Sequence, residues 1–235
     1  MAITTRIVDY DQDGQTFEGY LALPEAAPKA VVLVAHAWGG QSDFEREKAE
    51  LLAAWGYAGF ALDVYGKGQR GETTEECQAL MTPLASDRAK LQSRLAFGLQ
   101  VAKAETAAVK AGAIGFCFGG LSVLDMARAG MDVAGVVSFH GLLGAPGNTD
   151  GKPIAAKVLA LHGWDDPMAT PDDVMAFSKE MSEAGADWQL HAYGKTLHAF
   201  TNPAANDAGL GTVYSALADR RSFAAAKDFM AELFG

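Results

Sequence analysis

A short run around one of the two cysteines is the part of the sequence best suited to covalent chemistry. Residues 115–119 read Gly-Phe-Cys-Phe-Gly and lie between an apolar strand-like segment and a helix-like one. Glycines at both ends of such a run allow a sharp strand-to-helix turn, which exposes the central side chain. The unpaired N–H groups and the dipole of a helix N-terminus favour a thiolate, the nucleophilic form of cysteine. Cys117 is therefore the candidate nucleophile.

Two later segments offer the acid and the histidine that such a nucleophile needs. Asp165 and Asp166 follow an apolar run, and His198 comes after the last predicted strand. The order of nucleophile, acid and histidine is that of the α/β-hydrolases. Each residue falls at the carboxyl end of a strand, where open α/β sheets bind ligands. Pro167 biases the preceding residue toward an extended backbone, which favours Asp166 as the acid and leaves Asp165 as the alternative.

Alternating apolar and helix-like segments predict the elements that position these residues. A mostly parallel sheet with helices on both faces accounts for the alternation. A turn-rich Asp-Gln-Asp-Gly link separates the first two strands and indicates an antiparallel hairpin at one sheet edge. The expected strands cover residues 5–10, 17–23, 30–35, 57–63, 111–116, 133–139, 157–161 and 188–192. One helix is expected after the cap Ser42 and another after the cap Thr170, and further helices are expected over residues 87–109, 120–128 and 214–234. Loops are expected at residues 65–74, 142–152 and 198–211.

Composition limits what the protein binds and where it works. A chain of 235 residues with 49% hydrophobic content can build one large α/β domain over residues 1–235. The formal net charge of −10 opposes binding to nucleic acid or to an anionic membrane, so we expect a small-molecule ligand. The first 15 residues lack the layout of a signal peptide, and the apolar runs are too short to span a bilayer. We therefore expect a cytoplasmic protein.

The remaining cysteine, histidines and charged runs form no further pattern. Cys77 lies among acidic and polar residues and is interpreted as an incidental helix residue, not as a disulfide partner of Cys117. The five histidines lack the spacing of a metal site, so we expect no metal ion and no organic cofactor. The charged residues 45–48 are expected on the solvated face of their helix.

Five motifs follow one another along the chain and are informative as a set. They are Asp-Val-Tyr-Gly at 63–66, Gly-Phe-Cys-Phe-Gly-Gly at 115–120, Val-Ser-Phe-His-Gly at 137–141, His-Gly-Trp-Asp-Asp-Pro at 162–167 and His-Ala-Phe-Thr-Asn-Pro at 198–203. This set resembles the dienelactone hydrolase family over nearly the whole chain. The resemblance implies an α/β-hydrolase fold with about eight strands, and a triad of Cys117 as nucleophile, His198 as base and Asp166 as orienting acid. It also implies an oxyanion hole made by the backbone N–H groups of Trp38 and Phe118.

One position beside the expected oxyanion hole departs from the family pattern. In well-studied members a glutamate precedes the residue that matches Trp38 and holds the resting thiol, whereas this chain has Ala37. The way in which the thiol is activated is therefore open. Either Cys117 pairs directly with His198 as a thiolate–imidazolium, or His36 takes part.

Three side chains near predicted strand ends are candidates for the substrate pocket. His36 and His140 each follow a strand, and Tyr65 comes shortly after another. Buried histidines at such positions are commonly structural and hydrogen-bonded, and aromatic rings there often belong to the core. Both interpretations stay open for these residues.

The residues and the resemblance together predict a hydrolase that cleaves a carboxylic ester or lactone through an acyl-cysteine, similar to carboxymethylenebutenolidase. Well-studied members bind a substrate carboxylate with arginines, one of them four residues beyond the catalytic histidine, where this chain has Asn202. An ester or lactone is thus better supported than an anionic dienelactone. A thioesterase or a broad carboxylesterase is the enzymatic alternative, and a non-catalytic binding protein on a hydrolase scaffold is the alternative from another class. We expect a monomer or a weak homo-oligomer.

Overall fold

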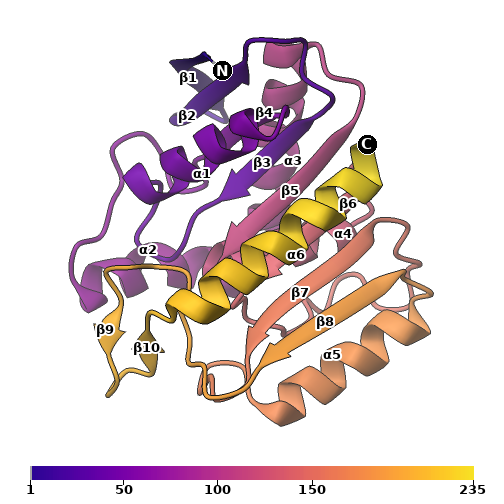
Figure 1. The fold of residues 1–235 in the computed structure, drawn as a ribbon. Helices are drawn as coiled ribbons and strands as arrows, with labels where there is room; N and C mark the ends of the chain where they lie inside the picture. Colours follow the sequence, from indigo (N-terminus) through magenta and orange to yellow (C-terminus); the bar gives the residue numbers. More distant parts are fainter. Residues whose placement is uncertain (1) are drawn as a thin grey trace.

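An eight-stranded β-sheet runs through the centre of the molecule (Figure 1). The computed structural model describes residues 2–235, and the strands follow the order β1-β2-β4-β3-β5-β6-β7-β8. β1 and β2 form an antiparallel hairpin at one edge, β2 is antiparallel to β4, and the other neighbours are parallel. The strands are β1 (Ile3–Gln12), β2 (Gln15–Pro24), β3 (Val31–Ala35), β4 (Ala58–Leu62), β5 (Ala111–Phe116), β6 (Gly135–Phe139), β7 (Lys157–Gly163) and β8 (Trp188–Tyr193).

The central strands are continuous apolar runs because both of their faces are covered. Every residue of β3, β4 and β5 is buried, whereas most residues of the edge strand β1 are exposed or half-buried. Strands buried on both faces of a parallel sheet have this composition. The carboxyl ends of β3 to β8 consequently meet at one rigid edge of the sheet.

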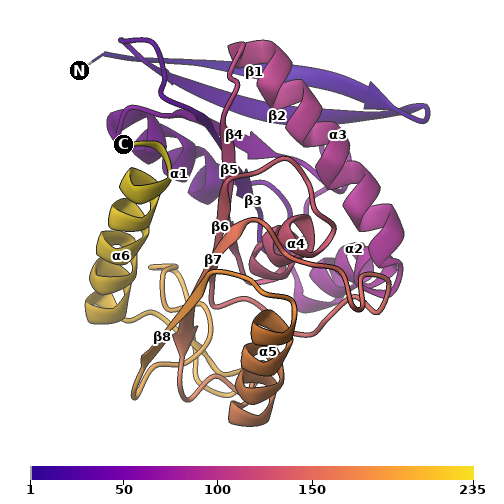
Figure 2. The same cartoon turned by 90° about the vertical axis from the view of Figure 1, so that its right-hand side faces the viewer.

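Helices cover both faces of the sheet (Figure 2). α1 and α6 pack on one face and α2 to α5 on the other, around two separate hydrophobic clusters. They are α1 (Asp43–Ala54), α2 (Thr74–Ser86), α3 (Arg88–Thr106), α4 (Phe118–Arg128), α5 (Pro171–Glu183) and α6 (Ala216–Phe234). In the part of the chain that the structure describes, no helix has both the length and the apolar character required to cross a membrane.

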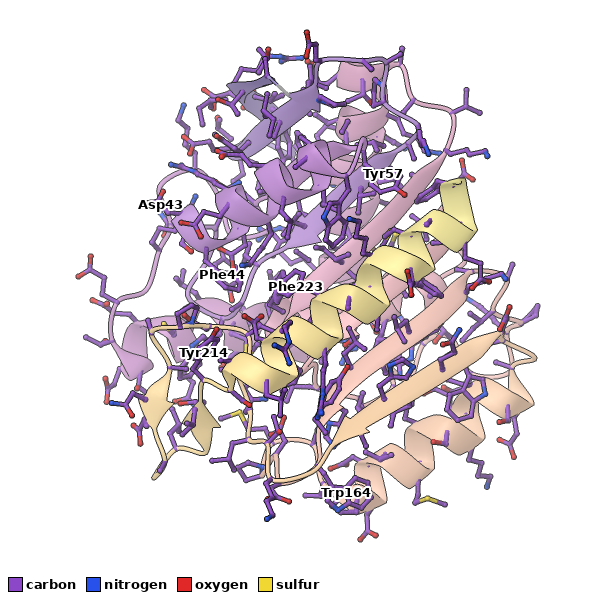
Figure 3. All side chains as sticks on the ribbon, viewed as in Figure 1. Asp43, Phe44, Tyr57, Trp164, Tyr214 and Phe223 are labelled. Carbon is purple, nitrogen blue, oxygen red and sulfur yellow. The ribbon has the colours of Figure 1, made fainter. Side chains whose placement is uncertain are left out.

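A lysine joins the two helices of the α1–α6 face. The Nζ atom of Lys48 lies 4.5 Å from the ring centroid of Phe44 and 5.0 Å from that of Phe223. Figure 3 shows these two rings on α1 and α6. Burial lowers the pKa of Lys48 from its ordinary value, because the charged form loses hydration. The attraction between the charge and the two rings compensates part of that loss and holds α6 against α1.

The fold class predicted from the sequence is confirmed, with three differences of detail. α4 begins at Phe118 rather than at residue 120, so its cap is the candidate nucleophile itself. α3 ends at Thr106 because Ala107 adopts a left-handed backbone with a φ of 51°. The segment 198–211, expected to be a loop, contains β9 (Asn206–Asp207), which pairs with β10 (Thr212–Val213).

Candidate active site

Cys117 lies on a strained turn between β5 and α4. It is the N-cap residue of α4, with a φ of 56° and a ψ of −114°, a conformation that residues with a side chain rarely adopt. Its N–H donates to the carbonyl of Phe139 at the end of β6, 3.1 Å away, which anchors the turn. The side chain is partly exposed. The turn therefore presents the thiol at the N-terminus of α4.

The two glycines of the motif are required by close contacts. A Cβ on Gly115 would lie 2.0 Å from the carbonyl oxygen of Gly119, and a Cβ on Gly119 would lie 2.0 Å from that of Ala35. Both distances are far shorter than any van der Waals contact. These glycines were expected to permit the turn through their conformational freedom, but the positive φ belongs to Cys117. The glycines instead allow α4 to start directly against the end of β3.

Asp166 and His198 form a buried hydrogen-bonded pair. The Nδ1 atom of His198 lies 2.7 Å from Oδ2 of Asp166, and both side chains are almost fully buried. Oδ1 of Asp166 accepts a hydrogen bond of 2.8 Å from the N–H of Met168, so both carboxylate oxygens are held. Asp165 is exposed, and its N–H donates to the carbonyl of Thr196. The structure thus brings Asp166, and not Asp165, to the histidine.

The β9–β10 hairpin holds the backbone of His198. The N–H of His198 donates to the carbonyl of Gly211 at 2.9 Å, and its own carbonyl accepts from the N–H of Val213 at 3.1 Å. Gly163, at the end of β7, lets this segment approach, because a Cβ there would lie 2.6 Å from the carbonyl oxygen of Leu197. The hairpin that the sequence reasoning missed therefore sets the position of His198.

His198 is arranged to carry a proton next to Cys117. Burial alone lowers the pKa of His198, but the charge of Cys117 and the hydrogen bond with Asp166 outweigh it and raise the pKa to about 10. Asp166 occupies Nδ1, whereas Nε2 makes no hydrogen bond within residues 2–235. Nε2 is consequently the ring atom available to exchange a proton with the thiol.

The strand order brings the loop after β3 beside the nucleophile. β3 lies between β4 and β5, and Ala35 at its end pairs with Gly115, so residues 36–38 start next to the Cys117 turn. Open α/β sheets bind ligands at such points, where the strand order reverses. In the described part of the chain, the N–H groups of Trp38 and Phe118 donate to no acceptor. Two backbone donors are thus left for a ligand.

His36 is buried beneath this loop, with both of its ring nitrogens bound to backbone groups. Its Nδ1 atom lies 2.7 Å from the carbonyl oxygen of Ala37, and its Nε2 atom accepts from the N–H of Val64 at 3.2 Å. Burial lowers the pKa of the ring from its ordinary value, which favours the neutral form. Ala37, the position at which the sequence departs from the family pattern, donates its N–H to Oε1 of the buried Glu45 at 3.3 Å.

Tyr65 lies against both the loop after β3 and the turn at Cys117. Its hydroxyl donates to the carbonyl of Trp38 at 2.9 Å, and its ring stacks on Phe118 with centroids 6.1 Å apart. Burial and the nearby charge of Cys117 raise the pKa of the hydroxyl far above its usual range. Tyr65 is therefore close to the thiol, although its side chain is almost completely buried.

His140 lies directly against the ring of His198. The two rings meet edge to face with centroids 5.1 Å apart, and Nε2 of His140 shares a hydrogen bond of 2.8 Å with Oγ1 of Thr201. Burial and the charge of His198 hold the pKa of His140 well below its ordinary value. A neutral, buried ring thus supports His198, and its side chain is only 2% exposed.

One residue near the site was misjudged from the sequence. Glu45 was expected on a solvated face but is buried, because its carboxylate closes the cap of α1 and reaches the loop after β3. Cys77 lies in α2, as expected, and its buried thiol donates to the carbonyl of Gly71 at 3.3 Å. Both cysteines are free thiols. Across residues 2–235, no group of His, Cys, Asp and Glu side chains is arranged to hold a metal ion.

Comparisons with known proteins agree with the motifs. The sequence model of the dienelactone hydrolase family matches residues 17–234. A dienelactone hydrolase-like promiscuous phosphotriesterase from metagenomic libraries is 33% identical, with a TM-score of 0.93 and complete coverage of both chains. A solved structure called m3DLH is 32% identical, again with a TM-score of 0.93 and complete coverage of both. A putative carboxymethylenebutenolidase of Aquifex aeolicus is 28% identical over 86% of this chain and 89% of its own. The chain therefore belongs to the dienelactone hydrolase family of ester and lactone hydrolases.

Proposed function

We propose that this protein hydrolyses a small carboxylic ester or lactone through an acyl-cysteine intermediate. The sulfur of Cys117 attacks the carbonyl carbon, and the π-electron pair moves onto the oxygen, which the N–H groups of Trp38 and Phe118 stabilise. The tetrahedral species collapses and expels the alkoxide, which takes a proton from Nε2 of His198. Water then gives a proton to Nε2 and attacks the acyl-cysteine. The second tetrahedral species that forms in this attack collapses, expels the thiolate of Cys117 and releases the carboxylic acid.

The observation that carries the proposal is the hydrogen bond of 2.7 Å between Nδ1 of the buried His198 and Asp166. The hydrogen bond from Nδ1 to Asp166 fixes the orientation of the ring and leaves Nε2 without a partner in the described chain. The charge of Cys117 is the first of the causes that raise the pKa of His198 against its burial. A base held on one side and open on the other is the arrangement that a nucleophilic triad requires.

The surroundings of Ala37 favour a direct thiolate–imidazolium pair. His36 was the other candidate for thiol activation, but its two ring nitrogens already bind the backbone at Ala37 and Val64. The buried carboxylate of Glu45 is likewise engaged with backbone and hydroxyl donors at the start of α1. His198 is then the group placed to pair with the thiol, in place of a glutamate.

Replacement of Cys117 by alanine tests the proposal. Turnover of p-nitrophenyl acetate by Cys117→Ala should fall to the uncatalysed background, a loss on the order of 10⁶-fold for removal of a triad nucleophile. Cys77→Ala is the matched control, because it removes the other thiol and should retain turnover. Mass spectrometry of the wild-type protein with a slow ester should find the acyl group on the peptide that contains Cys117. Unchanged turnover in Cys117→Ala would exclude the mechanism.

A substrate panel separates the proposal from its alternatives. An aromatic lactone, an aryl ester and an acyl thioester of equal acyl length should each give a kcat/KM. Faster turnover of the lactone and the oxyester supports the proposed class, whereas preference for the thioester indicates a thioesterase. If the folded wild-type protein turns over none of the three substrates, it is a non-catalytic binding protein.

Phosphotriester hydrolysis is a second candidate activity. The specific support is the full-length relative named as a promiscuous phosphotriesterase, which is 33% identical to this chain. A thiolate with two unpaired N–H donors beside it can attack a phosphorus centre as well as a carbonyl carbon. Diethyl p-nitrophenyl phosphate is the test compound, and its slow, Cys117-dependent turnover is the expected result.

A further inference from the structure

Three consecutive carbonyl groups of the loop after β3, those of Ala37, Trp38 and Gly39, are held by hydrogen bonds. The carbonyl of Ala37 accepts from Nδ1 of His36 at 2.7 Å and from the N–H of Gly40 at 3.1 Å. The carbonyl of Trp38 accepts from the hydroxyl of Tyr65, and that of Gly39 from a backbone N–H after β4. In contrast to these carbonyls, the N–H of Trp38 has no hydrogen-bond partner in the described residues.

The hydrogen bonds of His36 fix which of its ring nitrogens carries the proton. The N–H of Val64 can only donate, so Nε2 of His36 must accept this bond of 3.2 Å. In the neutral ring the proton is then on Nδ1, which donates it to the carbonyl of Ala37. His36 therefore connects the end of β4 to the peptide between Ala37 and Trp38.

Planarity of the peptide bond transmits this contact to the oxyanion hole. The carbonyl of Ala37 and the N–H of Trp38 belong to the same peptide group. A trans peptide is planar, and its C=O and N–H point in opposite directions. A donor that holds the carbonyl on the buried side thus fixes the direction of the N–H on the open side. Catalysis is sensitive to this direction because the donor must meet the oxyanion at about 2.7–3.1 Å.

We propose that His36 is a positioning residue of the oxyanion hole, which acts by holding the Ala37 carbonyl so that the Trp38 N–H points at the reacting oxygen. This inference rests on the proposed acyl transfer at Cys117. In this chain the loop after β3 is then supported by His36, which directly precedes Ala37.

Two substitutions of His36 separate its two hydrogen bonds. His36→Asn keeps a side-chain N–H near the place of Nδ1 and loses the bond from Val64. His36→Gln keeps an acceptor near the place of Nε2 and loses the donor to Ala37. Each variant removes one buried hydrogen bond, so a purely structural role would lower kcat in both to a similar degree.

The readouts are kcat for p-nitrophenyl acetate and the rate of Cys117 alkylation by iodoacetamide. Alkylation displaces iodide at a saturated carbon and forms no oxyanion, so it reports on the thiol and His198 alone. We expect His36→Gln to lose about 10- to 100-fold in kcat, somewhat less than deletion of an oxyanion donor costs. We expect His36→Asn to retain kcat within about threefold, and both variants to keep the alkylation rate.

Several outcomes overturn the inference. Equal losses of kcat in the two variants would do so, as would a parallel loss of alkylation, because the defect would then lie in the fold or in the triad. If the variants fail to fold, ¹⁵N NMR of the wild-type ring decides. An Nδ1–H tautomer at neutral pH supports the inference and an Nε2–H tautomer overturns it. Failure of the proposed function is distinguishable, since it would appear as full turnover by Cys117→Ala.

Discussion

The molecule contains two buried groups of charged side chains that are built in opposite ways. The first, the arginine cluster, lies between α3, α4 and α5. It consists of Arg88, Asp125, Arg128 and Glu180. The second, the proposed triad, lies at the carboxyl edge of the sheet. It consists of Cys117, Asp166 and His198.

The arginine cluster is saturated with hydrogen bonds. Arg88 binds both carboxylate oxygens of Asp125, each at 2.6 Å. Arg128 binds both carboxylate oxygens of Glu180, at 2.7 and 2.8 Å, and donates to two carbonyls of the loop between β6 and β7. None of these side chains has a buried polar atom without a partner in residues 2–235. The cluster therefore fixes a long loop that has no helix of its own.

The proposed triad has partners on one side only. Asp166 and Nδ1 of His198 are fully engaged, whereas Nε2 and the two neighbouring backbone N–H groups have no partner in the described residues. Buried polar groups are normally paired, so the unpaired Nε2 of His198 needs an explanation. A saturated network stabilises the fold, while an open one leaves atoms for a reacting group. This difference supports the triad, and not the arginine cluster, as the proposed site.

The largest expected effect that tests this comparison is at the acid of the triad. Asp166→Asn should lower kcat by about 10⁴-fold, because the amide favours the wrong tautomer of the histidine. Asp165→Asn is the matched control and should leave kcat nearly unchanged, since Asp165 is exposed and its side chain does not bind His198. Steady-state kinetics with p-nitrophenyl acetate and thermal unfolding measure both variants. Equal effects at the two positions would show that the hydrogen bond to Asp166 does not orient the base.

The three residues of the proposed triad could be selected from the sequence because each has a local signature. Glycines flank Cys117, Pro167 follows Asp166, and His198 follows the last long strand. These signals depend on a few adjacent residues, and strand ends of a parallel sheet meet at one edge whatever the details of packing. The same reasoning gave the strand positions, since buried strands are continuous apolar runs.

The supports of the site could not be predicted because they depend on which strands are neighbours. Only the pairing of β3 with β4 and β5 brings the His36 ring to the N–H of Val64 and the loop after β3 to Cys117. Glu45 belongs to the capping box of α1, a pattern that predicts an exposed side chain. Its burial results from tertiary contacts that the local pattern does not show. β9 and β10 are two residues each, too short for a periodic pattern.

A smaller effect, on stability rather than on rate, is expected in the arginine cluster. Arg128→Met removes the donor to the half-buried carboxylate of Glu180 and to the carbonyl of Leu143. Asp125 keeps its two bonds with Arg88, so the free energy of unfolding should fall by about 1–3 kcal/mol. Lys179→Met is the control, since Lys179 pairs with Glu183 at 3.8 Å on an exposed face, and should cost less than about 1 kcal/mol. Urea unfolding measures both. The folded Arg128→Met protein should keep its kcat, and a rate loss as large as that of Asp166→Asn would erase the distinction between the two groups.

The smallest expected effect is a change in the titration of His198. In the wild-type protein the raised pKa keeps the ring protonated at neutral pH. The stability that this proton contributes is complete below the ordinary histidine pKa of about 6.5 and is lost as the pH rises through about 10. Cys117→Ala removes the charge of Cys117, the first of the causes that raise the pKa of His198. Burial still disfavours the protonated ring, so the pKa of His198 should fall below about 10.

NMR of ¹³C-labelled histidine rings measures this shift, with Cys77→Ala as the control that should leave the titration unchanged. His140 provides an internal check. The charge of His198 helps to hold the pKa of His140 below its ordinary value, so weaker protonation of His198 should allow the pKa of His140 to rise. Opposite shifts of two rings 5.1 Å apart are a signature that loosened packing does not produce. An unchanged His198 titration in Cys117→Ala would mean that Asp166 alone holds the proton, and the triad would then be a saturated pair like those of the arginine cluster.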